Sequence, residues 1–273
     1  MSTSRRLPTL YIPHGGGPCF FMDVPPGLPP HMWDKMAAYL RGLADSLGMR
    51  PSAVLVISGH WETAPPTVNT GLHPPLLFDY YGFPPHTYQL TYPAPGSPEL
   101  AARVKTLLEG AGMDCAEDSQ RGLDHGVFVP FKLIYPQADM PMVQMSLNRN
   151  LDAAAHLEIG RALAPLRDEN VLIVGSGMSY HNLRDFYSDD PRAVAAAEQF
   201  DEWLADAVTE PDSRARQNKL TAWSGAPGAR ACHPRPEHFI PLMVAAGAAD
   251  DDVAKRVFHD RLLGKPVSGF QFG

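Results

Sequence analysis

The chain has 273 residues, of which 44% are apolar and 19% charged, and its net charge is −7. This apolar content is too high for a disordered protein, and no apolar run reaches the ~18 residues of a membrane span. The acidic balance argues against a nucleic-acid partner, because phosphate binding needs clustered Lys and Arg. The three cysteines are far apart, which disfavours a disulfide framework, and the start lacks a signal-peptide core. We therefore expect a soluble cytoplasmic protein.

Apolar runs of strand length alternate with segments of helical periodicity along the chain. The apolar runs predict strands at 10–13, 53–58, 142–147, 171–175 and 267–272. The helical spacing predicts helices at 32–47, 100–108, 157–166, 194–208 and 237–246. This alternation predicts a single α/β domain over residues 1–273, with a central, mostly parallel or mixed β-sheet flanked by helices on both faces.

The segment 61–98 contains nine of the 28 prolines. Proline lacks the backbone N–H that helices and central strands need, so neither structure is expected there. The segment also carries large apolar side chains, among them Phe78, Tyr80 and Tyr88, which would be costly to leave in water. We expect a rigid loop packed on the domain rather than a linker, and loops of this length are usually functional.

Several histidines lie just beyond predicted strands. His14 follows the first strand, His60 the second, and His181 comes shortly after the fourth. Ligands of open α/β sheets bind beyond the carboxyl ends of strands, so these side chains can converge on one site. A single histidine is most often a surface or satisfied core residue, but flanking motifs recur here and at His238. The run 15–17 is all glycine, which permits positive φ and close approach of the backbone to a ligand.

Most other catalytic motifs are missing. His14-Gly-Gly-Gly is similar to the oxyanion-hole motif of lipases, but the chain has no Gly-x-Ser-x-Gly. It also has no phosphate-binding loop, no dinucleotide fingerprint and no His-Glu-x-x-His. Cys19 could act as a nucleophile, although a buried, inert thiol is the commoner case. These exclusions leave a metal site built from imidazoles.

Seven short motifs occur in order along residues 14–242. They are His14-Gly-Gly-Gly-Pro, Ser58-Gly-His-Trp, Tyr92-Pro-Ala-Pro-Gly-Ser-Pro98, Asp124-His-Gly, Pro141-Met-Val-Gln-Met-Ser146, His181-Asn-Leu and Pro236-Glu-His-Phe-Ile-Pro-Leu242. Together they resemble the class III extradiol ring-cleavage dioxygenases. The match looks closest to the DOPA 4,5-dioxygenase-like branch, which is related to the catalytic subunit of protocatechuate 4,5-dioxygenase. The resemblance implies a non-haem Fe(II) enzyme that cleaves a catechol with O2, with Zn possible in place of iron.

The resemblance also implies roles for individual residues. It assigns His14, His60 and His238 as metal ligands, and imidazole is a good ligand for Fe(II). It assigns His181 as the acid–base group, with His125 assisting, although the counterpart of His181 is a fourth ligand in some zinc-loaded relatives. Protocatechuate-type enzymes use a glutamate as third ligand, so Glu237 is the competing candidate. Adjacent residues on a helix point ~100° apart, so only one of the two should bind, and we expect His238.

One alternative class remains open from the sequence. A zinc hydrolase on the same scaffold could use His181 or His125 as a general base beside metal-bound water, and an inactive metal-binding homologue would keep only the ligands. The expected partners are a small-molecule catechol and O2. A DOPA-like substrate with a para side chain is favoured by the resemblance alone. The sequence leaves the oligomeric state undetermined.

Overall fold

The computed structural model describes residues 6–273, in which eight strands form one mixed sheet. The strands are β1 (Thr9–Pro13), β2 (Ala53–Thr63), β3 (Thr67–Asn69), β4 (Ala116–Asp118), β5 (Met142–Asn148), β6 (Val171–Gly177), β7 (Ala254–Leu262) and β8 (Lys265–Phe272), in the order β4-β3-β5-β2-β6-β1-β8-β7. Strands β5, β2, β6 and β1 are parallel, whereas β8 is antiparallel to β1 and β3 to β5. The predicted mixed sheet is confirmed.

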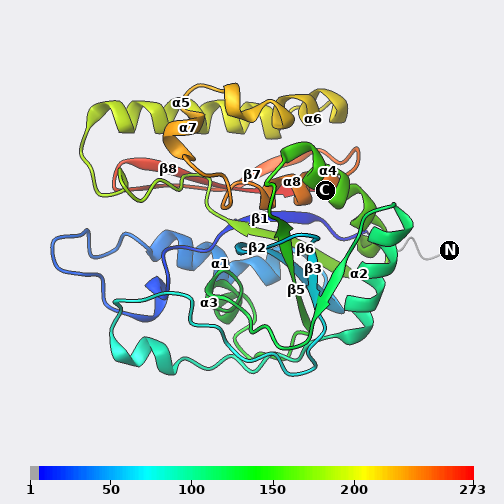
Figure 1. Cartoon of the computed structure of the whole chain (residues 1–273). Helices are drawn as coiled ribbons and strands as arrows, with labels where there is room; N and C mark the ends of the chain where they lie inside the picture. Colours follow the sequence, from blue (N-terminus) through cyan, green and yellow to red (C-terminus); the bar gives the residue numbers. More distant parts are fainter. Residues whose placement is uncertain (1–5) are drawn as a thin grey trace.

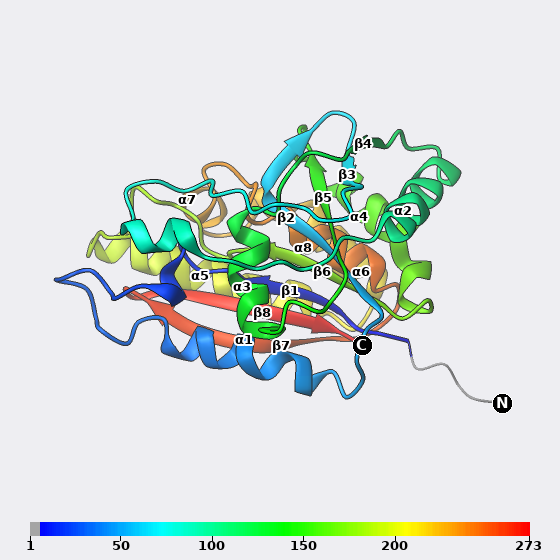
Figure 2. The same ribbon diagram turned by 90° about the horizontal axis from the view of Figure 1, so that it is seen from below.

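Helices cover both faces of this sheet, as predicted. They are α1 (Asp34–Ser46), α2 (Pro98–Gly110), α3 (His125–Ile134), α4 (Ala153–Leu163), α5 (Pro191–Val208), α6 (Ser213–Thr221), α7 (Ala229–Cys232) and α8 (Pro241–Ala248), with short 3-10 turns η1 (Cys19–Phe21), η2 (Pro85–Gln89), η3 (Ala164–Arg167) and η4 (Trp223–Gly225). Helices α1 and α3 lie below the sheet and α5 above it in Figure 1, and Figure 2 shows α1 and α3 from their own side. None of the helices within residues 6–273 is long and apolar enough to cross a membrane.

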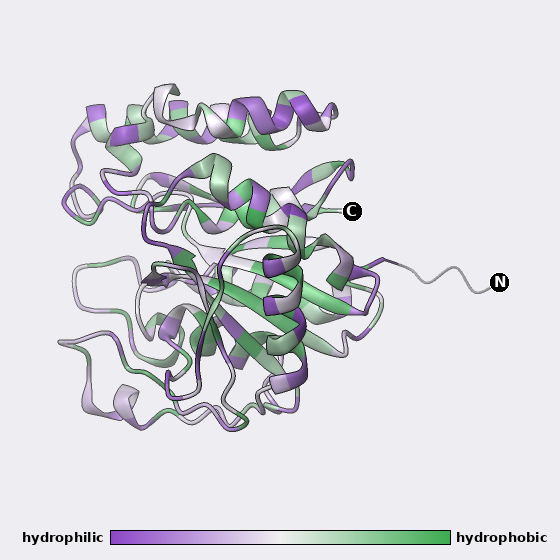
Figure 3. Cartoon of the chain, turned by 45° about the vertical axis from the view of Figure 1, so that its right-hand side comes forward, coloured by the Kyte–Doolittle hydropathy of each residue, from purple (hydrophilic) through white to green (hydrophobic). Residues whose placement is uncertain are grey.

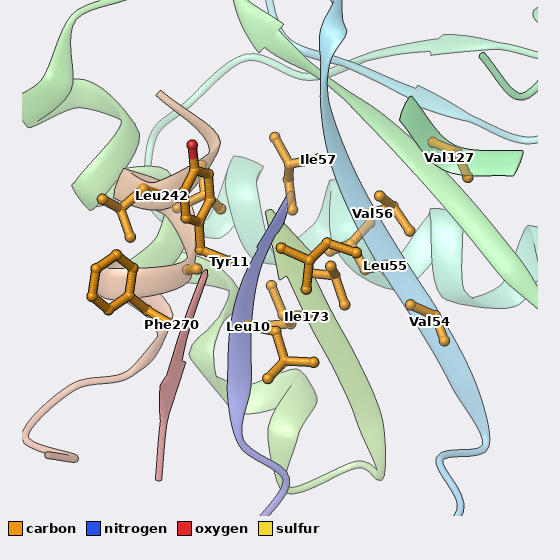
Figure 4. Packing of buried hydrophobic residues seen from close by; sticks show 14 of the residues in the cluster. Leu10, Tyr11, Val54, Leu55, Val56, Ile57, Val127, Ile173, Leu242 and Phe270 are labelled. Carbon is orange, nitrogen blue, oxygen red and sulfur yellow. The ribbon is translucent and has the colours of Figure 1, made fainter. Parts of the chain in front are cut away.

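The core lies on both sides of the parallel strands. Successive side chains of a strand point to opposite faces, yet Leu55 and Val56 are both fully buried. This two-sided burial explains the continuous apolar runs from which the central strands were predicted. Figure 4 shows Tyr11 of β1 packed beside Leu242 of α8. Figure 3 shows the hydrophobic residues concentrated in the central strands and many hydrophilic ones on the upper helices.

Two predicted boundaries were wrong near the sequence motifs. Strand β2 continues to Thr63 instead of ending at Ser58, because its pairing with β5 shifts between Ile57 and Glu62 and then resumes. The helix predicted at 237–246 begins only at Pro241. Proline there has no N–H for the carbonyl four residues earlier, so a helix cannot run through it undisturbed. Residues 237–240 instead form a turn closed by bonds from the Phe239 and Ile240 amides to the Pro236 carbonyl.

The proline-rich segment is a packed loop over most of its length, as expected. The exceptions are residues 61–63, which complete β2, the short strand β3, the 3-10 turn η2 and Pro98, which begins α2. The loop is held against the start of α3, because the Leu77 amide donates to the Leu123 carbonyl (2.8 Å) and the rings of Phe78 and Phe128 are 5.6 Å apart. It therefore brings residues 78–83 to the carboxyl ends of the parallel strands.

Candidate metal centre

Three of the predicted histidines converge beyond the sheet. His14 follows β1, His60 lies in the irregular part of β2, and His238 lies in the turn before α8. The Nε2 atom of His60 is 3.2 Å from Nε2 of His14 and 3.0 Å from Nε2 of His238. One ring nitrogen from each residue lies within 4.8 Å of the others. The structure thus brings together the three residues that the sequence analysis assigned as ligands.

Backbone geometry places these side chains. The register shift in β2 between Ile57 and Glu62 is a bulge-like irregularity, a feature that re-aims side chains beside active sites, and His60 lies within it. The His238 carbonyl accepts hydrogen bonds from the Tyr11 hydroxyl (2.7 Å) and the Met178 amide (3.1 Å). A Cβ on Gly177 would lie 2.0 Å from that carbonyl oxygen, so the turn can pack on β6 only because residue 177 is glycine.

Hydrogen bonds on the far side of two rings settle their tautomers. The Ser176 hydroxyl donates to the Gly126 carbonyl, so it accepts from Nδ1–H of His14 (3.1 Å). Nδ1–H of His238 donates to the Glu237 carboxylate (3.0 Å). Both Nε2 atoms therefore carry lone pairs that face the cluster.

Burial keeps the three imidazoles neutral. Burial, together with the charges of neighbouring histidines, holds the pKa values of His14 and His238 well below the ordinary value. Burial and the charge of His125 lower the pKa of His60 to about 3. Neutral imidazole is the form that binds metals, so the cluster offers its lone pairs at neutral pH without first losing protons.

The donor set fits a divalent first-row metal ion. Two imidazole nitrogens bound ~2.1 Å from one ion, and 90–110° apart around it, lie ~3.0–3.4 Å from each other. The two nitrogen separations at His60, 3.2 and 3.0 Å, match that spacing. A single N–H on His60 could satisfy only one of the two facing lone pairs, whereas a cation satisfies all three rings at once.

Two further histidines flank the cluster, and each is held by a carboxylate. The His181 ring stacks on His238 with centroids 3.4 Å apart, and the His125 ring is 3.9 Å from that of His60. Nδ1 of His125 is 2.7 Å from Oδ1 of Asp79, and Nδ1 of His181 is 3.1 Å from Oε1 of Glu237. Two overlapping acid–histidine groups thus adjoin the three-histidine cluster.

Each carboxylate bridges one ring of the cluster and one flanking ring. Asp79 also lies 3.6 Å from Nδ1 of His60, and Glu237 also accepts from His238. Burial opposes ionisation of both acids, but the hydrogen bond from His125 holds the pKa of Asp79 below its usual value. The hydrogen bond from His181 does the same for the pKa of Glu237. Two ionised carboxylates therefore face the Nδ1 sides of four rings.

Asp79 is the functional residue that the sequence analysis missed. It lies in the proline-rich loop, and its carboxylate also accepts from the backbone amide of His125 (3.0 Å). The available signal was weak: a single acid among the aromatic residues 78–83 of a loop already expected to be functional.

A cavity of about 630 Å³ opens over the cluster. All five histidines line it, together with aromatic side chains. Tyr80, Tyr81 and Tyr180 are among these aromatic residues. Cys19 lines it too, but burial raises the pKa of the thiol to about 12, so this cysteine stays protonated and is a poor nucleophile.

The metal-free protein should lose stability as the pH falls from 7.5 to 5. Burial lowers the pKa of His233 to about 3, and that of His60 likewise, whereas an unfolded histidine has a pKa of ~6.5. Between these values the unfolded chain binds more protons, so acid favours unfolding; above pH ~7 the effect vanishes. At pH 5 the loss is about 2 kcal/mol for His233 alone. Urea unfolding at both pH values measures it.

A matched variant tests whether His233 causes this pH dependence of stability. His233 packs among Phe200, Trp223 and Phe239, so His233→Phe keeps an aromatic ring but cannot titrate. Its stability should depend less on pH by about 2 kcal/mol over this range. An unchanged pH dependence would show that His233 is not buried as a neutral ring.

Comparison with known proteins identifies related sequences. The family described as "Catalytic LigB subunit of aromatic ring-opening dioxygenase" matches residues 8–270. A "4,5-DOPA dioxygenase extradiol" of Beta vulgaris is 46% identical over 214 residues, covering 77% of this chain and 78% of the relative. "Dioxygenase tasH" of Hapsidospora irregularis is 39% identical over 278 residues, covering 97% and 85%. The crystal structure of an uncharacterized protein from Escherichia coli K12 superposes with a TM-score of 0.77 at 31% identity, covering 98% of this chain and 100% of that one.

Proposed function

Because the chain belongs to the family of the catalytic LigB subunit of aromatic ring-opening dioxygenase, and is an extradiol dioxygenase, we propose that it uses Fe(II) to cleave a substituted catechol with O2. We also propose that residues 1–273 form one catalytic domain. The observation that carries the proposal is the convergence of three neutral imidazoles beneath an aromatic-lined cavity.

His14, His60 and His238 would hold the metal through Nε2. Glu237 is the weaker candidate for third ligand, because its Oε1 already accepts from His238 and His181, and its Oε2 lies 3.3 Å from Arg235. Three imidazoles suit Fe(II), and they also suit zinc, so either metal can fill the site. Fe(II), when bound, would supply open coordination positions for the diol oxygens and O2 and the electron density for oxygen chemistry.

His181, assisted by His125, would move protons over the open side of the cluster. Asp79 and Glu237 hold Nδ1 of these rings, which leaves each Nε2 free to accept a proton from a catechol hydroxyl and to return it later. The two ionised carboxylates stabilise the imidazolium formed in between. Aromatic walls at Tyr80 and Tyr180 suit a flat ring and help to exclude water.

In the proposed reaction, one catechol and one O2 give one ring-opened product that contains both oxygen atoms. The bond that breaks joins a hydroxyl-bearing carbon to its neighbour outside the diol. Ring carbon is oxidised to a carboxylic acid and an aldehyde, and O2 is reduced, so no further oxidant or reductant is needed.

Anaerobic reconstitution with Fe(II), followed by exposure to air with a series of catechols, tests this function. A yellow product absorbing in the near-visible should appear, with one O2 consumed per catechol. Tyrosine, a monophenol that cannot chelate, should be inert, and zinc-loaded protein is the matched control. If no diol causes O2 uptake, the proposal fails and the hydrolase alternative gains support.

A further inference from the structure

Exposed apolar side chains gather at the mouth of the cavity. The large hydrophobic residues exposed within 6–273 are Leu72, Tyr81, Leu183, Tyr187 and Val253. Three of these five, Tyr81, Leu183 and Tyr187, line the cavity, and they are 92%, 67% and 66% exposed. Exposed apolar side chains gathered in this way mark a binding surface rather than chance exposure. We name these three residues the apolar rim.

The rim comes from two loops that lie far apart in the sequence. Tyr81 belongs to the proline-rich loop, and Leu183 and Tyr187 to the loop between β6 and α5; both loops lie on the left in Figure 1. The histidine cluster lies at the carboxyl ends of β1 and β6, and the rim lines the same cavity. A ligand can therefore touch the cluster with one end and the rim with the other.

The described residues that line this path offer no lysine or arginine to an anion. Apart from the histidines, the one charged residue lining the cavity in the described chain is Asp23, which is exposed. Neither Lys nor Arg is among the lining residues within 6–273. Arg184 follows Leu183 in the chain but does not line the cavity. A carboxylate held between the cluster and the rim would lose part of its hydration without gaining a cationic partner from the lining residues.

The size of the cavity also indicates a substituent beyond the diol ring. A volume of about 630 Å³ lies within the range that buries drug-sized ligands rather than single rings. The histidines adjoin the end where the diol would bind, so the remaining surface for a substituent consists, apart from Asp23, mainly of apolar and aromatic walls.

We propose that the preferred substrate is a catechol carrying a bulky, uncharged apolar substituent that reaches the apolar rim, and that catechols with a carboxylate, amino acids included, are poor substrates. This inference rests on the proposed function and names the substrate class of that same site. Leu183 is the specificity-determining residue it singles out, because it is apolar, exposed and at the mouth.

The test compares two catechols of similar size. They are 4-butylcatechol and 3-(3,4-dihydroxyphenyl)propanoate, which differ mainly in the charge at the end of the side chain. For the Fe(II)-loaded protein, kcat/KM should favour 4-butylcatechol by ~10-fold or more, chiefly through KM. Anaerobic calorimetric titration of the same protein should give the same order of Kd values, independently of turnover. DOPA, which also carries a carboxylate, should resemble the propanoate in its low kcat/KM and weak binding.

A charge-installing variant tests the position of the substituent. Leu183→Arg should shift the preference toward the propanoate by ~3-fold or more, because it supplies the missing cation at a partly exposed site. Leu72→Arg is the matched control, since Leu72 is also an exposed leucine (56%) but does not line the cavity. That variant should keep the wild-type preference.

The outcomes separate this inference from the proposed function. Tighter binding or faster turnover of the propanoate or DOPA by the wild-type protein would overturn the substrate class while leaving the dioxygenase intact. An identical shift in Leu183→Arg and Leu72→Arg would overturn the placement at the rim. Absence of O2 uptake with every catechol, together with the expected order of Kd values, would remove the proposed function and leave the inference about the cavity standing.

Discussion

His238→Ala should abolish metal binding and, with it, ring cleavage. The Nε2 atom of His238 is one of three lone-pair donors that face one another, and its Nδ1 is already engaged by Glu237. Removal of one of three protein ligands should weaken metal affinity by more than the ~10–100-fold typical of outer hydrogen-bond partners. His14→Ala and His60→Ala should behave alike. Metal content after dialysis and a competitive chelator titration measure the effect.

Two control variants make this result specific. Glu237→Gln keeps an oxygen that can accept from His238, so it should retain one metal per chain with affinity reduced by ~10–100-fold at most. His31→Ala removes an exposed imidazole, paired only with Asp34, and should change nothing. Metal retained by His238→Ala and lost by Glu237→Gln would mean that the carboxylate is the third ligand.

His181→Ala and His125→Ala should keep the metal but lower kcat by ~10²–10⁴-fold, the usual loss for a positioned acid–base group. Both rings adjoin the cluster, and each has its Nδ1 held by a carboxylate, so their free nitrogens are suited to proton transfer rather than required for ligation. Steady-state kinetics on Fe(II)-loaded variants, with metal content measured in parallel, separates the two roles. Loss of metal from the His181→Ala variant would mean that His181 is primarily a metal ligand rather than an acid–base group.

The sequence predicted the two ligand candidates, His14 and His60, whose positions follow from where strands run. His14 directly follows an apolar run that is buried on both sides, and His60 follows another, so their meeting at one edge of the sheet is a consequence of parallel topology. His238 could be assigned only through its motif and the resemblance, because no predicted strand precedes it.

The carboxylates that orient the rings could not be predicted in the same way. Asp79 reaches His125 and His60 because a loop folds back on α3, and loop paths leave no periodic signal in the sequence. Glu237 was expected at the start of a helix over 237–246, next to the ligand rather than beneath its ring. The turn that actually contains it directs the carboxylate to Nδ1 of His238 and His181 instead.

Some elements escaped prediction because their burial pattern is not periodic. Helix α3 is buried along nearly its whole length and contains Pro130, so it shows neither an apolar stripe nor an uninterrupted helical sequence. Strands β3 and β4 have three residues each, too few to show alternation.

Labelling with 18O2 decides whether the protein inserts both atoms of O2 into a catechol by extradiol cleavage. The Fe(II)-loaded protein is mixed with 4-butylcatechol under 18O2, and the trapped product is analysed by mass spectrometry. We expect a ring-opened semialdehyde in which the bond beside the diol is broken and both added oxygen atoms derive from O2. A product without label, or a dicarboxylate formed by cleavage between the two hydroxyl-bearing carbons, would contradict it even if the metal is bound by His14, His60 and His238.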